Sequence, residues 1–209
     1  MKTGVDIKEL KEIEKKILKG INLDNSVTNI KLLAAFDIAY SKNKYICAAV
    51  VLNFETNEII EKKIITGEEI MPYSPKLAVF REGPVILETY RSLDNKPDVL
   101  MIKGDGMLNK FKVGLASYVG VLINKPTIGV SKDLLFGRLD EDRIMVDNEM
   151  RGMALKTKQF ANPVYVTPGH KINLEKSVEV VKKFIIEPYK LPLPLHLAHK
   201  LANKEKKDK

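Results

Sequence analysis

The residue in this 209-residue sequence that most clearly points to chemistry is Asp37, because it interrupts an apolar run. The run from Leu32 to Tyr40 reads LLAAFDIAY, which is typical of a strand buried on both faces. An ionised carboxylate in such a strand is unfavourable by several kcal/mol unless it is paired, hydrogen-bonded or bound to a metal. We therefore expect Asp37 to bind a buried lysine, backbone N–H groups or a metal ion, and this stretch alone leaves these alternatives open.

Three further stretches place polar residues beside glycine or at the end of an apolar run. Glu82 stands immediately before Gly83-Pro84, where the proline cannot donate a helical hydrogen bond and should bend a helix. The segment 103–106, KGDG, follows the apolar run 98–102, and its two glycines permit a tight, exposed loop. Lys132 follows another apolar run. These residues are candidates for a shared site.

The elements that would position these residues are predicted from hydrophobic periodicity. Strands are predicted at 32–40, 45–53, 59–66, 98–102, 126–130 and 164–167, and helices at 10–21, 75–90, 114–122, 173–186 and 191–203. Short polar turns join the first three strands, which favours an antiparallel meander. Pro75 suits the first turn of the second helix, with Ser74 as its cap. Residues 132–152 are predicted to be less regular.

Composition and charge limit the class of protein. We expect one mixed α/β domain over residues 1–209, with an N-terminal helix within 1–21 and a basic, disordered tail at 204–209. No apolar run approaches the roughly 20 residues that a membrane span needs, so no membrane partner is expected. The single cysteine, Cys47, lies in an apolar strand and favours a cytoplasmic location. The net charge of +8 suits a polyanionic partner, although a lysine- and glutamate-rich composition also suits a thermophile.

Several unusual motifs occur in a fixed order along the chain. They read FDIAYS, MPYSPKLAVFREGP, GLASYVGVLINKPTIGVSK, VYVTPGHKINL and a closing Leu-Pro-x-Pro-Leu segment. Together, over residues 32 to 201, they resemble the endonuclease V family. The resemblance implies a ribonuclease H-like α/β fold, with a mixed five-stranded sheet of three antiparallel and then two parallel strands, and helices on both faces.

The resemblance also implies an activity. Members of this family are metal-dependent DNA repair endonucleases that use Mg²⁺, for which Mn²⁺ can substitute. They recognise deoxyinosine, a deaminated adenine, in damaged DNA and hydrolyse the second phosphodiester bond on its 3′ side. Some members act on inosine in RNA. A monomer is the expected state.

The motif positions carry roles over to this sequence. Asp37 and Glu82 match metal-binding carboxylates, Lys132 matches a lysine near the cleaved phosphate, and His170 matches a histidine near the metal. Residues expected to contact DNA are Pro72, Tyr73 and Pro75 as a wedge at the lesion, Gly83, Gly104 and Gly106 as points of close backbone approach, and Lys110. His196 and His199 are expected to face solvent.

One metal-binding position departs from the family pattern. Lys103 stands where the family has an aspartate, and Asn109 stands where it has a histidine. An ammonium group cannot bind Mg²⁺. Three alternatives remain: Asp105 supplies the missing carboxylate and completes a metal site with Asp37 and Glu82, Lys103 partly substitutes for the metal charge, or the protein has lost catalysis and retains nucleic-acid binding.

Overall fold

The computed structural model describes residues 7–24, 26–69, 71, 74, 77–108 and 113–207. Its helices are α1 (Ile7–Gly20), α2 (Ala78–Arg91), α3 (Leu115–Ile123), α4 (Leu174–Lys183) and α5 (Leu193–Lys207). Its strands are β1 (Leu32–Ser41), β2 (Lys44–Asn53), β3 (Ile59–Glu68), β4 (Val99–Lys103), β5 (Thr127–Ser131), β6 (Arg138–Asp140), β7 (Arg143–Val146), β8 (Glu149–Leu155) and β9 (Val164–His170). The helices and the six strands that periodicity predicts are confirmed, to within a few residues at their ends.

One mixed sheet runs through the described part of the chain in the order β3-β2-β1-β4-β5-β9-β8-β7-β6. The predicted arrangement of three antiparallel strands followed by two parallel ones is confirmed for β3-β2-β1-β4-β5. The predicted count of five strands is wrong, because β9, β8, β7 and β6 extend the sheet with antiparallel pairs.

The short strands β6, β7 and β8 fall in the region predicted to be less regular. Tight turns join them, and Glu141, Asp147 and Asn148 adopt positive φ angles there. Two successive positive-φ residues are typical of a two-residue hairpin turn, so Asp147-Asn148 was the indication of strand pairing in this region. Strands β6 and β7 are too short for alternation to stand out in the sequence, and β8, EMRGMAL, does not alternate.

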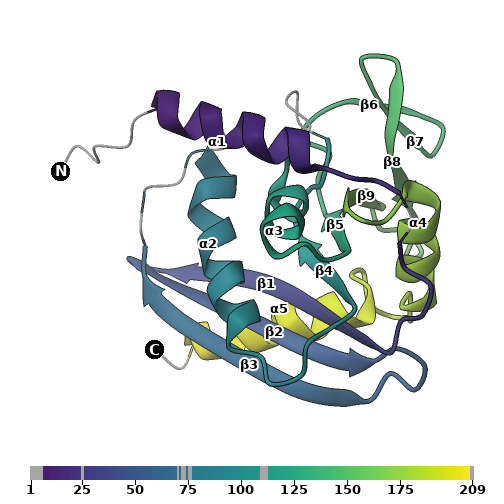
Figure 1. Cartoon of the computed structure of the whole chain (residues 1–209). Coiled ribbons are helices and arrows are strands. Elements are labelled where there is room, and N and C mark those ends of the chain that lie inside the picture. The colour runs from purple at the N-terminus through teal and green to yellow at the C-terminus, as the bar shows by residue number, and fades with distance from the viewer. Residues whose placement is uncertain are drawn as a thin grey trace.

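Helices cover both faces of the sheet (Figure 1). Side chains alternate along β1, so that Leu33 and Ala35 pack in the same core cluster as residues of α4 and α5. Ala34 and Phe36 pack in a second cluster with α1, α2 and α3. Asp37 continues this alternation and its side chain therefore lies on the α5 face.

Two helix ends differ from prediction. Ser74 does not cap α2: the helix begins at Ala78 after Leu77, whose N–H donates to the Ser74 carbonyl at 2.9 Å in the preceding turn. Pro75 lies outside the described residues. At the other end of the chain, α5 continues to Lys207, so residues 204–207 are helical and not disordered. Their sequence, KEKK, consists of strong helix formers.

Within the described ranges, none of the helices has both the length and the apolar character needed to cross a bilayer.

Candidate active site

Strand register brings Asp37 and Lys103 side by side. Strands β1 and β4 are parallel and pair Phe36 with Ile102, so the next residue of each strand points to the same face. The Lys103 Nζ donates to Asp37 Oδ1 at 2.7 Å, and only 3% of the Asp37 side chain is exposed. The apolar run left open whether Asp37 binds a lysine, backbone N–H groups or a metal ion. The structure places a lysine beside it.

The second oxygen of Asp37 contacts a histidine from the other end of the chain. His199 Nδ1 lies 2.5 Å from Asp37 Oδ2 and 3.4 Å from Lys103 Nζ. The backbone N–H of Ile38 also donates to Asp37 Oδ1, at 2.9 Å. Each carboxylate oxygen of Asp37 thus already has at least one hydrogen-bonding neighbour.

The prediction that His199 faces solvent misses its contact with Asp37, although 36% of its side chain is exposed. Helix α5 packs against β1 and β2, and Leu195, Ala198 and Ala202 on the same helix are fully buried. His199 lies four residues after Leu195, so its position on the apolar stripe was an indication that sequence reasoning missed. His196 is half-buried and stacks on the ring of Tyr189, with 3.9 Å between the ring centroids.

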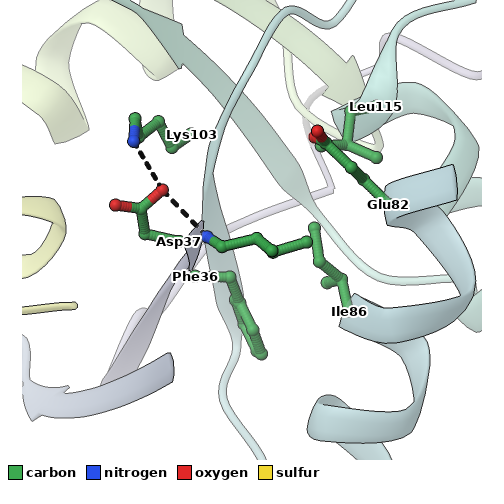
Figure 2. A pocket seen from close by; sticks show the side chains of 7 residues that line it. Phe36, Asp37, Glu82, Ile86, Lys103 and Leu115 are labelled. Carbon is green, nitrogen blue, oxygen red and sulfur yellow. Dashed lines mark hydrogen bonds and ion pairs between the residues drawn. The ribbon is translucent and has the colours of Figure 1, made fainter. Parts of the chain in front are cut away.

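Glu82 reaches the same pocket from α2 (Figure 2). The cavity has a volume of about 120 Å³, and its lining consists of the charged residues Asp37, Glu82 and Lys103 and the apolar residues Phe36, Ile38, Ile86 and Leu115. Burial raises the pKa of the Glu82 carboxyl, and the negative charges of Asp37 and Asp105 add to this, while Arg81 and Lys103 partly offset it. A carboxyl that keeps its proton unusually long is suited to proton transfer.

Arg81, which precedes Glu82 in the first turn of α2, anchors that turn to the sheet. The Arg81 guanidinium pairs with Glu69 Oε1 at 3.0 Å and lies 3.7 Å from the centroid of the Tyr40 ring. Because Arg81 is 6% exposed, these contacts fix the helix against the ends of β1 and β3 and thereby position Glu82.

Lys132 follows β5 at the same edge of the sheet. Burial lowers the pKa of the Lys132 ammonium group, the positive charge of Lys103 lowers it further, and the negative charge of Asp37 opposes the shift. The charges of Lys103 and Asp37 thus act on Lys132, and its role near the cleaved phosphate stays a prediction.

The donor set does not fit the predicted metal ion. In the described ranges, no three or more His, Cys, Asp or Glu side chains gather closely enough to hold one. Strand β4 ends at Lys103, and Gly104 has a φ of +154°, so Asp105 does not continue the strand alternation onto the Asp37 face. The Asp37–Glu82–Asp105 metal site is therefore not formed, and its place at Asp37 is taken by Lys103.

His170 is not brought to the pocket. Strands β5 and β9 are antiparallel: Thr127 pairs with His170 at one end and Ser131 with Tyr165 at the other, which is the pocket end. His170 Nδ1 accepts a hydrogen bond from the Asn22 N–H at 3.2 Å. Its predicted place near a metal fails because β9 runs in the opposite direction to β5.

Gly83, Gly104 and Gly106 were predicted as points where the backbone comes close to DNA. In the structure, Gly83 and Gly106 instead allow close packing within the protein. A Cβ atom on Gly83 would lie 2.4 Å from the Tyr118 ring, and one on Gly106 would lie 2.1 Å from the Pro168 carbonyl oxygen. Both residues are buried, which does not agree with contact to a base, whereas Gly104 is half-buried at the end of β4. Predicted site residues that lie outside the described ranges are Pro72, Tyr73, Pro75, Asn109 and Lys110.

Comparisons with known sequences agree on one family. The family model for Endonuclease V matches residues 12–200. Endonuclease V of Dictyoglomus thermophilum is 36% identical over 202 residues, covering 93% of this chain and 86% of the relative. Endonuclease V of Bacillus thuringiensis is 34% identical over 220 residues, covering 95% and 93%.

Solved structures agree on the fold. The Endonuclease V structure from Bacillus subtilis superposes with a TM-score of 0.90 at 26% identity, covering 99% of this chain and 94% of that one. Ciona intestinalis Endonuclease V, solved with a 24mer DNA containing an inosine followed by a ribo-adenosine, has a TM-score of 0.84 at 24% identity and covers 97% and 98%. The α/β architecture with a mixed sheet is the ribonuclease H-like fold expected from the motifs.

Proposed function

The chain belongs to the endonuclease V family, and we propose that it recognises inosine in nucleic acid and hydrolyses a phosphodiester bond near that base. The observation that carries this proposal is the pocket at the edge of the sheet, where Asp37, Glu82 and Lys103 meet. A cluster of ionisable groups in a partly buried cavity is a typical place for catalysis. The inosine-containing DNA held by the Ciona relative is a molecule of the proposed substrate class.

The chain's own groups suit an anionic substrate. A backbone phosphate would meet the ammonium groups of Lys103 and Lys132, which stabilise the negative charge that grows as water attacks phosphorus. Glu82, with its raised pKa, would accept the proton of that water. Asp37 would hold Lys103 in place through their 2.7 Å hydrogen bond.

The family activity implies Mg²⁺, or Mn²⁺ in its place, as the group that polarises the phosphate and activates water. The donor set around Asp37 does not fit that ion, so we derive no catalytic step from it. The finer features of the proposal are hydrolysis of the second bond on the 3′ side of deoxyinosine, a role in DNA repair, a cytoplasmic location and a monomeric state. They rest on the motif match and on the buried single cysteine, Cys47.

The direct test uses the purified chain and a labelled duplex with one deoxyinosine. Products are mapped at nucleotide resolution, with Mg²⁺, with Mn²⁺ and with EDTA. We expect one cut on the 3′ side of the lesion and none in the matched undamaged duplex. A parallel inosine-containing RNA decides the preferred sugar, because a ribose 2′-hydroxyl is a recognisable group. The absence of any cut under all three conditions would contradict the nuclease proposal.

Lys103 favours a second candidate function, an inosine-binding protein with little or no cleavage. In that case the Asp37→Ala variant has the same background activity as the natural chain and nearly the same affinity for the inosine duplex. A large loss of turnover in Asp37→Ala, with binding retained, would instead support the nuclease.

A further inference from the structure

The pocket contains a cation of its own. Where a metal-dependent nuclease would bind a divalent ion against the strand carboxylate, this chain places the Lys103 ammonium, 2.7 Å from Asp37 Oδ1. Lys103 comes from the adjacent parallel strand, so backbone pairing, and not a flexible loop, sets its position. We infer that the Lys103 ammonium replaces the divalent cation at Asp37, so that the pocket binds a backbone phosphate without a metal ion.

The hydrogen bonds of Asp37 support this inference. Its Oδ1 atom accepts from Lys103 and from the Ile38 N–H, and its Oδ2 atom lies 2.5 Å from His199 Nδ1. A metal ion at Oδ1 would have to displace Lys103 or the Ile38 N–H, and one at Oδ2 would lie beside His199, whose Nδ1 atom is 3.4 Å from the Lys103 ammonium. Because Asp37 is 3% exposed, the displaced groups would lose a partner where little water is available to replace it.

Charge around the pocket points the same way. Asp37, Glu82 and Lys103 line one pocket, and the positive charge of Lys103 also acts on the nearby Lys132 ammonium. A divalent cation would enter beside two ammonium groups, whereas a singly charged phosphodiester would be attracted to them. The Lys103 side chain lines the pocket, and 26% of it is exposed. Its ammonium can therefore contact a phosphate while it stays paired with Asp37.

The inference concerns the same pocket as the proposed function. It rests on that function for the ligand, an inosine-containing nucleic acid. It is tested with the full-length chain, a fluorescent deoxyinosine duplex and its undamaged counterpart, at constant ionic strength. Anisotropy gives the affinity in EDTA and in millimolar Mn²⁺. Thermal unfolding with and without Mn²⁺ reports metal binding independently of any nucleic acid.

For the natural chain we expect affinities for the inosine duplex in EDTA and in Mn²⁺ that agree within about twofold, and no shift of Tm with Mn²⁺. Lys103→Asp supplies an oxygen ligand beside Asp37, so its Tm should rise with Mn²⁺ and its duplex binding should become Mn²⁺-dependent by about tenfold or more. Lys103→Met removes the charge without adding a ligand. It should bind the duplex about tenfold more weakly in EDTA and gain nothing from Mn²⁺.

Lys62→Asp, at an exposed position of β3, is the control for the charge reversal and should behave as the natural chain in both measurements. A natural chain whose Tm rises with Mn²⁺ as much as that of Lys103→Asp would overturn the inference. So would a Lys103→Met variant that binds as tightly as the natural chain in EDTA. If no variant distinguishes inosine from adenine, the proposed function fails, while the Mn²⁺-dependent Tm values still decide whether Lys103 excludes the metal.

Discussion

At the scale of single residues, the pairing of Asp37 with Lys103 affects both stability and activity. Asp37→Asn removes the charge that compensates Lys103, and we expect the free energy of unfolding to fall by about 1–3 kcal/mol. The loss should stay below that of a fully buried ion pair because the Lys103 side chain is 26% exposed. Urea unfolding measures it. Asp105→Asn makes the same charge change at a half-buried position off the Asp37 face and should be less damaging. Equal losses would contradict the assignment.

Glu82 gives a pH dependence with a defined sign. Its folded pKa is raised above the ordinary value of 4.5, so the fold favours the protonated form. The contribution to stability is complete below pH 4.5 and is lost as pH rises through the raised folded pKa. Glu82→Gln cannot lose a proton, so the natural chain should become less stable relative to this variant as pH rises above 4.5. Unfolding in urea across this pH range checks it. A constant difference between the two proteins would refute the shift.

At the scale of elements, the close approach of α2 and α3 positions Glu82. Gly83→Ala would put a Cβ atom 2.4 Å from the Tyr118 ring, which is already held edge-to-face against Phe80 at 5.8 Å between centroids. We expect a loss of about 1–3 kcal/mol from overpacking. Cleavage should fall as well, because Glu82 moves with the helix. Arg91→Ala, exposed at the end of α2, is the control and should change unfolding by less than about 0.5 kcal/mol.

The loop between β8 and β9 lies at the pocket edge of the sheet, since β9 begins beside the end of β5. It presents Phe160, which is 94% exposed, with the exposed lysines Lys156 and Lys158 close by in sequence. An exposed ring among lysines suits stacking on an unpaired base. Phe160→Ala should weaken nucleic-acid binding about fivefold or more and leave Tm unchanged.

Anisotropy with a single-stranded oligonucleotide measures the effect of Phe160→Ala. Leu122→Ala is the matched control, because Leu122 is 49% exposed near the end of α3, away from the pocket edge. Equal affinities for the two variants would remove the loop from the binding surface.

At the scale of the whole molecule, the net charge of +8 predicts salt-dependent binding. Each lysine that neutralises a phosphate releases counterions, and affinity then falls steeply with salt. We expect a decrease of about tenfold or more between roughly 50 and 200 mM NaCl, measured by anisotropy. The ratio of affinities for inosine and adenine duplexes should change much less, because contacts to the base are not counterion-driven. Salt-independent binding would contradict a phosphate-directed surface.

The sequence by itself determined the elements of the core and the candidate carboxylates. Apolar runs and polar turns are local properties, so β1, β2, β3 and their antiparallel meander follow from them. The burial of Asp37 follows for the same reason, because it lies within such a run. The three strands at residues 138–155 did not follow, since β6 and β7 have only three and four residues and β8, EMRGMAL, does not alternate between apolar and polar residues.

Only the tertiary structure decided what Asp37 binds. Lys103 is 66 residues away in sequence and His199 is 162 residues away, so strand register and helix packing alone bring them to the same carboxylate. The two-residue spacing from Lys103 predicted Asp105 as a ligand, and the motif match predicted His170 near the metal, but the end of β4 at Lys103 and the antiparallel direction of β9 separate them from Asp37. A site assembled from several strands and helices is set by long-range pairing, which no local pattern in the sequence encodes.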